Sequence, residues 1–253
     1  MVFYRTSPNS FASSRVSYSG YYIALPRQRY GFDSRYPLQK TRLIGYDTVI
    51  TTIFFDFDGV LTTDTNGSGT VCRNLQKAVP DLSFDDLYRC YRGRHSLITL
   101  GKATHADIWN EFCSCTGKNI DIALLYDALK SAPKNEGMFE LCEVLRKNYK
   151  TGIITDNTKE RFALLVKDMQ LNTLFDFIIL SADIGAIKSE PLIFAEALRM
   201  AKAKAEECVF IDNTKRNLEV PARMGFRTYY HDDTQNDLVS LREQLKAWRI
   251  AIK

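Results

Sequence analysis

Residues 49–62 read VITTIFFDFDGVLT, and they join an apolar run to a turn that carries two carboxylates. The run is rich in β-branched and aromatic residues, which favours a buried strand. Because side chains alternate along a strand, Asp56 and Asp58 are expected on one side of the chain where the strand ends. Gly59 permits the sharp exit that follows. Two neighbouring carboxylates are costly to bury without a cation or a shared proton, so this segment predicts a metal or acid–base site.

Further strand-like runs follow this one, and helical patterns separate them. We expect strands over 49–55, 150–155, 176–181, 207–211 and 227–230, and helices over 136–148, 158–170, 190–203, 215–224 and 235–248. This alternation is typical of parallel βαβ units, whose apolar strands are covered by helices on both faces. The predicted fold class is therefore α/β, with helices on both faces of a parallel sheet.

One connection is far longer than a single crossover helix requires. It covers residues 60–149, and helix-forming segments with amphipathic spacing recur in it over 83–92, 95–101, 104–114 and 121–130. We interpret the insertion as a helical subdomain over 71–132, which leaves 47–70 and 133–253 for the core.

Residues 1–46 differ from the rest in composition and charge. They carry seven basic residues and one acid, whereas residues 47–253 carry 27 basic and 29 acidic residues. We interpret 1–46 as a disordered extension; an organellar transit peptide and a mis-assigned start site are the alternatives. The mildly acidic body argues against a nucleic-acid partner. The apolar runs fall far short of the ~20 residues that a membrane-spanning helix needs, so no membrane partner is expected.

The cysteines are scattered along the chain without a CxxC pair. They are Cys72, Cys90, Cys113, Cys115, Cys142 and Cys208. We interpret them as reduced thiols of a cytoplasmic protein, because a chain of 253 residues does not need disulfides to fold. A soft-metal site at the Cys113 and Cys115 pair is disfavoured, since no second pair follows at zinc-finger spacing.

Polar side chains are expected at one edge of the sheet, where the carboxyl ends of parallel strands meet. The segments concerned are DFDGVLT (56–62), Thr155-Asp156-Asn157, KSEPLIF (188–194) and FIDNTKRNLEVPARMGF (210–226). Together, in this order, they closely resemble the four motifs of the haloacid dehalogenase-like hydrolase superfamily. The resemblance covers about residues 49–231, and it implies a Rossmann-like parallel sheet with a helical cap inserted after the first motif.

The resemblance also implies roles for individual residues. Asp56 is similar to the nucleophile that forms an aspartyl-phosphate, and Asp58 to the general acid and then base. Thr155 and Lys188 are similar to residues that bind the phosphoryl oxygens, and Lys188 also holds the nucleophile ionised. The substrate-binding set implied is Thr155, Asp156, Asn157 and Lys188.

A magnesium ion is the cofactor that the resemblance implies. Its ligands would be Asp56, the main-chain carbonyl of Asp58, and Asp212, with Asn213 at the position where the family usually has a second acid. A hard divalent ion offsets the repulsion between an anionic nucleophile and an anionic phosphate. A neutral amide at position 213 predicts weaker metal binding than a second acid would give.

The function implied is a Mg²⁺-dependent phosphatase that acts on a small phosphorylated metabolite. A phosphomutase and a non-catalytic binding module are the alternatives, and a carbon–halogen hydrolase is disfavoured because it needs neither Asp58 nor Asp212. The oligomeric state is left open. Five cap residues are candidates to bind an anionic part of the substrate, although exposed arginines are more often only solvated: Arg73, Arg89, Arg92, Arg94 and His95.

Overall fold

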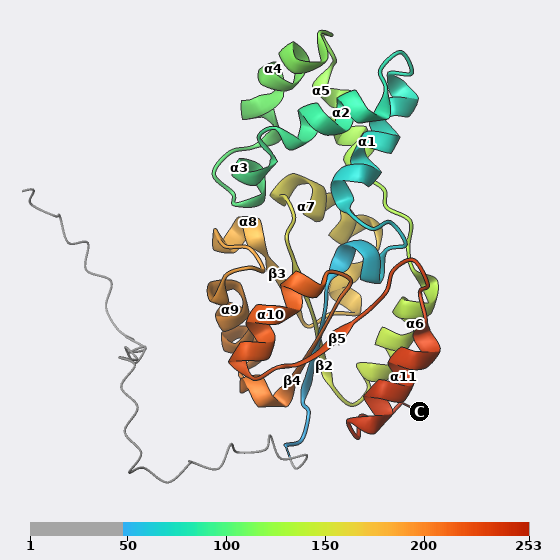
Figure 1. Ribbon diagram of the computed structural model, residues 1–253, viewed down its shortest axis with the longest axis vertical. Helices are drawn as coiled ribbons and strands as arrows, with labels where there is room; N and C mark the ends of the chain where they lie inside the picture. The colour runs from blue at the N-terminus through green and yellow to red at the C-terminus, as the bar shows by residue number, and fades with distance from the viewer. Residues whose placement is uncertain (1–47, 253) are drawn as a thin grey trace, which may run out of the picture. The chain divides into compact units, whose positions relative to one another are not determined.

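The computed structural model describes residues 48–252, so the predictions for residues 1–46 lie outside the described residues. Its centre is a five-stranded sheet in the order β3-β2-β1-β4-β5, in which every neighbouring pair is parallel. The strands are β1 (Thr52–Phe55), β2 (Lys150–Thr155), β3 (Phe177–Leu180), β4 (Cys208–Asp212) and β5 (Arg227–Tyr230). The predicted α/β fold with a parallel sheet is confirmed (Figure 1).

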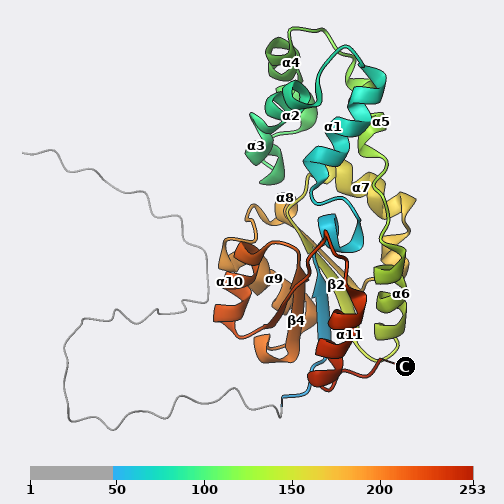
Figure 2. The same ribbon diagram turned by 45° about the vertical axis from the view of Figure 1, so that its right-hand side comes forward.

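Helices cover both faces of the sheet, as Figures 1 and 2 show. They are α6 (Glu136–Leu145), α7 (Lys159–Asp168) and α11 (Leu238–Ala247) on one face, and α9 (Pro191–Ala201) and α10 (Lys215–Met224) on the other. The alternation of side chains in β1 explains the division, because Ile53 and Phe55 belong to the first apolar cluster and Phe54 to the second. All three side chains are fully buried. The sheet is thereby fixed between two cores.

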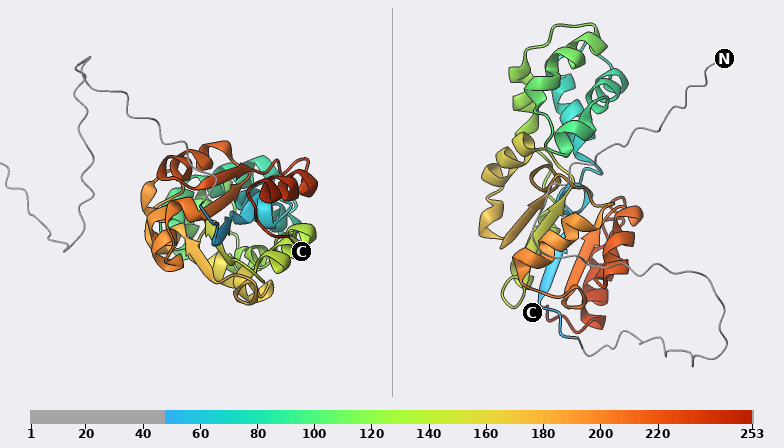
Figure 3. Two further views of the ribbon diagram at one scale, coloured as in Figure 1. Left: turned by 90° about the horizontal axis from the view of Figure 1, so that it is seen from below. Right: turned by 90° about the vertical axis from the view of Figure 1, so that its left-hand side faces the viewer.

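A cap of five helices follows the first strand and lies beyond one end of the sheet (Figure 3). The helices are α1 (Gly67–Ala78), α2 (Phe84–Arg92), α3 (His95–Thr99), α4 (His105–Thr116) and α5 (Ile122–Leu129). They have an apolar cluster of their own, which includes Leu75, Leu87, Phe112 and Leu125. The inserted helical cap was predicted, but its proposed boundary between residues 70 and 71 falls inside α1.

Two adjacent segments join the cap to the core. Thr62 and Lys134 form an isolated antiparallel bridge, and the amide of Thr63 donates to the Pro133 carbonyl at 2.9 Å. The amide of Asn135 donates to the Leu61 carbonyl at 3.0 Å, which continues the same pairing. The chain therefore leaves and re-enters the core at one place.

Cap and core also meet through buried polar contacts. Glu160, in the first turn of α7, accepts a hydrogen bond from the backbone amide of His105 at 2.8 Å, and its carboxylate lies 3.3 Å from His105 Nδ1. The Ser181 hydroxyl, at the start of the short helix α8 (Ser181–Ile184), donates to the Thr99 carbonyl at 2.8 Å. These contacts hold the cap against α7 and α8.

The prediction that all cysteines are reduced is wrong for one pair. Cys90 in α2 and Cys115 in α4 form a disulfide, whereas Cys72, Cys113, Cys142 and Cys208 are free. The two helices pack in the cap core, which brings residues 25 positions apart into bonding distance. Spacing in the sequence cannot reveal such a pairing, because helix packing decides it.

Candidate active site

The carboxyl ends of β1, β2 and β4 deliver the predicted motif residues, except Asp212, to the lining of one cavity of about 150 Å³. Asp56 follows β1, Thr155 ends β2, and the loop after β4 begins at Asn213. The cavity is also lined by the cap and by the first turn of α7. Its lining includes Asp56, Asp58, Ser68, Tyr91, Arg92, His95, Thr155, Asp156, Asn157, Arg161, Lys188 and Asn213. A larger cavity of about 790 Å³, between α6 and the end of α7, contains none of the motif residues.

Lys188 joins the two central carboxylates. Its Nζ lies 2.7 Å from Asp56 Oδ2 and 2.7 Å from Asp212 Oδ2, and all three residues are buried. Burial raises the pKa of Asp56 well above its ordinary value; Lys188 opposes this rise and Asp212 adds to it. Burial would lower the pKa of Lys188, but the attraction of Asp212 and Asp56 outweighs it, and the net pKa is raised. One ammonium therefore faces two carboxylates, and the centre carries a net negative charge when both are ionised.

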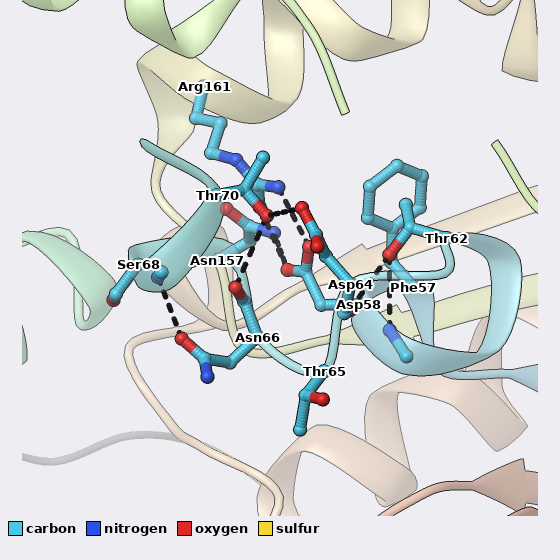
Figure 4. Close-up of polar contacts among 12 residues, drawn as sticks. Phe57, Asp58, Thr62, Asp64, Thr65, Asn66, Ser68, Thr70, Asn157 and Arg161 are labelled. Atoms are coloured by element: carbon cyan, nitrogen blue, oxygen red, sulfur yellow. Dashed lines mark hydrogen bonds and ion pairs between the residues drawn. The ribbon is translucent and has the colours of Figure 1, made fainter. Parts of the chain in front are cut away.

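Asp58 is held by an arginine that the sequence analysis did not single out. Arg161 Nη1 and Nη2 donate to its two carboxylate oxygens at 2.8 and 2.7 Å, and Asn157 Nδ2 donates at 3.0 Å (Figure 4). Burial would lower the pKa of Arg161, but Asp58 outweighs it and the pKa is raised. A Cβ at Gly67 would collide with the Arg161 guanidinium, so only glycine lets the first residue of α1 approach the pair. The general-acid candidate is thus fixed where the cap begins.

The signal that could have identified Arg161 is its position in the chain. It lies in the first turn of α7, three residues after the N-cap Thr158, and this helix starts directly after the carboxyl end of β2. First-turn side chains of such helices lie beside the ligand site of a parallel sheet. Its burial, at 2% exposure, depends on the cap above it.

The loop after β2 contributes a second set of buried polar groups. Thr155 is 1% exposed and lines the cavity. Asp156 Oδ1 accepts the backbone amide of Lys188 at 3.0 Å, and burial raises the pKa of Asp156, with Lys188 opposing the rise. The backbone amide of Asn157 donates to the Ser181 hydroxyl at 3.0 Å. The predicted substrate-binding residues are therefore brought together, and two of them also orient Lys188 and Asp58.

Asn213 packs against the loop that carries the two first-motif carboxylates. Its Nδ2 donates to the Thr65 carbonyl at 3.2 Å, and a Cβ at Gly59, which has φ +81°, would collide with the same amide. Asp212 accepts hydrogen bonds from the Thr214 amide at 2.7 Å and from Asn217 Nδ2. Asn213 thus holds the loop in place, and its predicted role as a metal ligand stays a prediction.

The donors at this centre fit a magnesium ion in their chemistry. Mg²⁺ takes oxygen ligands, keeps several waters, and is bound through one or two carboxylates together with substrate oxygens. Asp56, Asp212 and the main-chain carbonyl of Asp58 would supply such oxygens, and the two carboxylates share the single ammonium of Lys188. Among residues 48–252, no group of three His, Cys, Asp or Glu side chains is placed to hold a metal ion by itself. Main-chain, water and substrate oxygens would therefore have to complete the coordination.

The chain matches a family model, the haloacid dehalogenase-like hydrolases, over residues 50–225. The chain belongs to this family. The matched residues span the motif residues described above, from Asp56 to Asn213. This haloacid dehalogenase-like hydrolase carries a helical cap, formed by α1 to α5.

Proteins similar to this chain have different activities in their names. Bifunctional epoxide hydrolase 2 of Rattus norvegicus is 29% identical over 211 residues, which cover 75% of this chain and 38% of that protein. Pyrophosphatase PpaX of Bacillus cereus is 26% identical over 94 residues, which cover 37% of this chain and 44% of that protein. The chain therefore matches less than half of the length of these relatives.

Solved structures share the fold. A family enzyme of Bacteroides thetaiotaomicron in complex with magnesium and inorganic phosphate is 19% identical, with a TM-score of 0.64 over 76% of this chain and 98% of that one. An L-2-haloacid dehalogenase of Xanthobacter autotrophicus with chloropropionic acid covalently bound is 15% identical, with a TM-score of 0.57 over 80% and 85%. Likeness at these identities shows the fold alone.

Proposed function

We propose that this haloacid dehalogenase-like hydrolase is a Mg²⁺-dependent phosphatase that hydrolyses a small phosphorylated metabolite through an aspartyl-phosphate at Asp56. The observation that carries the proposal is Asp58, whose carboxylate lines the same cavity two residues after the nucleophile candidate. Hydrolysis of a phosphate ester uses such a group first to protonate the leaving oxygen and then to deprotonate the attacking water. Displacement of a halide needs no leaving-group acid.

The chemistry proceeds in two displacements. In the first, an Asp56 oxygen forms a bond to phosphorus while the bond to the leaving oxygen breaks. Asp58, which must leave its pairing with Arg161 and take up a proton when the substrate binds, gives that proton to the leaving oxygen. In the second, water attacks phosphorus, Asp58 takes the proton, and the bond between phosphorus and Asp56 breaks. Lys188 and Thr155 offer hydrogen bonds to the phosphoryl oxygens. A bound Mg²⁺, held by Asp56, Asp212 and the Asp58 carbonyl, would neutralise charge between nucleophile and phosphate.

The substrate is small, because the cavity holds only about 150 Å³. The proposal includes no nucleic-acid or membrane partner and a cytoplasmic location. No helix among residues 48–252 has the length and apolar character needed to cross a membrane. Four free cysteines support the cytoplasmic location, and the Cys90–Cys115 disulfide counts against it.

A single turnover in ¹⁸O-labelled water tests the proposal against dehalogenase chemistry. In a phosphatase, water attacks phosphorus, so the label enters inorganic phosphate and the Asp56 carboxylate stays unlabelled. In a carbon–halogen hydrolase, water attacks the carboxyl carbon of an ester, so the label enters Asp56. Mass spectrometry of the phosphate and of the Asp56 peptide separates the two.

The matched control is Asp56→Asn, which should release no phosphate. Phosphoryl transfer to a second substrate molecule with little phosphate release would support the phosphomutase alternative. No turnover of any ester, with and without Mg²⁺, would support the non-catalytic alternative.

A further inference from the structure

The cap arginines differ in what they contact. Arg73 lies 2.6 Å from Asp64, Arg89 lies 3.1 Å from Asp86, and Arg94 lies 2.8 Å from Glu111. Arg92 lines the active-site cavity instead. Within residues 48–252 it has no carboxylate within ion-pair distance.

Arg92 is also distinct from the other cations of the cavity. Lys188 is shared by Asp56 and Asp212, and Arg161 is paired with Asp58. Among the described lining residues, Arg92 is therefore the cation whose charge no carboxylate balances. Arg92 is exposed, so water solvates its charge until an anion of the substrate supplies the balancing charge.

Two neutral neighbours orient Arg92. Its Nη1 lies 3.3 Å from His95 Nδ1 and 3.5 Å from the Ser68 hydroxyl, and His95 Nε2 lies 3.2 Å from the same hydroxyl. Burial lowers the pKa of His95 to about 3, with a further contribution from Arg92, so the imidazole is neutral near pH 7.

The hydrogen bonds assign a direction to this network. His95 Nδ1 faces two groups, Arg92 Nη1, which can only donate, and the Thr99 hydroxyl at 2.9 Å, which can also donate. We therefore take Nδ1 as the acceptor, and the neutral ring then carries its proton on Nε2, which donates to Ser68. The Ser68 oxygen then accepts, and its own proton is left for another acceptor. Ser68 and Arg92 both line the cavity, so this side of the site offers hydrogen-bond donors.

The core contributes acceptors to the same cavity. Asp56 and Asp58 line it and are paired with Lys188 and Arg161, whereas Asp156 also lines the neighbouring cavity that contains Arg92 and His95. A second anionic group of a substrate would be repelled by these carboxylates and attracted by the cap. The neighbouring cavity has a volume of about 280 Å³, so a leaving group has room on the cap side.

We propose that Ser68 and Arg92, positioned by His95, form an anion-recognition face that selects phosphate esters whose leaving group carries a second anion beside the phosphate. The inference rests on the proposed phosphatase function. The shared chemistry is a carboxylate or a second phosphate, and Arg92, which lines both the active-site cavity and its neighbour, places this anion on the cap side of the scissile bond. The phosphate then faces Lys188, and the second anion faces the cap.

Paired substrates test the inference. Phospholactate and isopropyl phosphate differ in a carboxylate against a methyl group, and ethylene glycol bisphosphate and ethyl phosphate differ in a second phosphate. We expect wild type to prefer at least one anionic member by about 10- to 100-fold in kcat/KM, mostly through KM. The anionic member that is preferred identifies the source of the second anion.

Variants assign the preference to the cap. Arg92→Met should remove most of the preference, and Arg92→Lys should restore part of it. Arg89→Met, on the same helix but paired with Asp86 and 64% exposed, is the matched control and should keep the preference. His95→Leu should raise KM for the preferred substrate with kcat retained, and His95→Gln, which keeps a donor toward Ser68, should lower KM again.

Two negative results are distinguishable. Turnover of isopropyl and ethyl phosphate at the rate of their anionic partners, or a preference that survives Arg92→Met in a protein with an unchanged melting temperature, overturns the inference and leaves the phosphatase in place. No turnover of any of the four esters, together with no labelled phosphate in ¹⁸O water, overturns the proposed function and the inference with it.

Discussion

Removal of the Arg161 guanidinium should cost more stability than loss of a surface ion pair. The Arg161→Met substitution leaves the Asp58 carboxylate with Asn157 as its remaining side-chain donor. The Arg161 side chain is 3% exposed and that of Asp58 is 13% exposed, so water compensates poorly. Breaking a buried pair from one side costs ~3–5 kcal/mol, and the partial exposure of Asp58 favours the lower end, about 3 kcal/mol.

A double-mutant cycle separates this interaction from general packing loss. Asp58→Asn removes the charge that Arg161→Met leaves unpaired, so the double variant should be more stable than the sum of the single effects by about 2 kcal/mol. Urea denaturation in metal-free buffer measures it, and Trp109 in the cap and Trp248 in the core report on both parts of the chain. At about 2–4 °C per kcal/mol, the single variant should melt about 6–12 °C below wild type.

Arg199→Met is the matched control, because Arg199 also makes two contacts with one carboxylate, that of Glu196, but is 70% exposed. It should change stability by less than about 1 kcal/mol. Additive effects of the Arg161 and Asp58 substitutions within about 0.5 kcal/mol would refute the reasoning, since the two groups would then not depend on each other for stability.

Four other outcomes are expected. Asp56→Asn should abolish phosphate release, and without metal its melting temperature should stay or rise because one of two crowded carboxylates loses its charge. Reduction of the Cys90–Cys115 bond should cost about 3 kcal/mol in urea denaturation, and a Cys90→Ser variant should not respond to reductant. Burial alone would raise the pKa of Glu160, but hydrogen bonds from His105 lower it to about 2; stability should therefore fall from about pH 4.5 toward pH 2, and less so in Glu160→Gln. Asn213→Asp should lower the half-saturating Mg²⁺ concentration of phosphate release; an unchanged value would mean that residue 213 is not a ligand.

Strand-end residues were predictable because a parallel sheet gathers its carboxyl ends. Asp56, Thr155 and Asp212 each follow or end an apolar strand, so local pattern and topology lead to the same edge. The order of the motifs also predicted Lys188, which lies three residues before the start of α9 at Pro191.

Features that depend on the cap were not predictable in the same way. Helix α1 begins Gly67-Ser-Gly-Thr, which are poor helix formers. Asn66 caps it, and the buried hydroxyls of Ser68 and Thr70 hydrogen-bond to His95 and Asp64. From the sequence alone, Arg161 is expected to be a solvated helix residue, whereas in the structure it is buried beneath the cap. In each case tertiary packing outweighs local preference.

The pairing of Thr62 with Lys134 has a consequence for how such enzymes diversify. For the core, the whole cap is a long loop closed at its base, and the entropy of closing a loop rises only slowly with its length. Exchange of the residues between Thr62 and Lys134 would leave unchanged the two points at which the chain leaves and re-enters the core. Recombination at two neighbouring points can therefore exchange the cap while Asp56, Lys188 and Asp212 of the core keep their places.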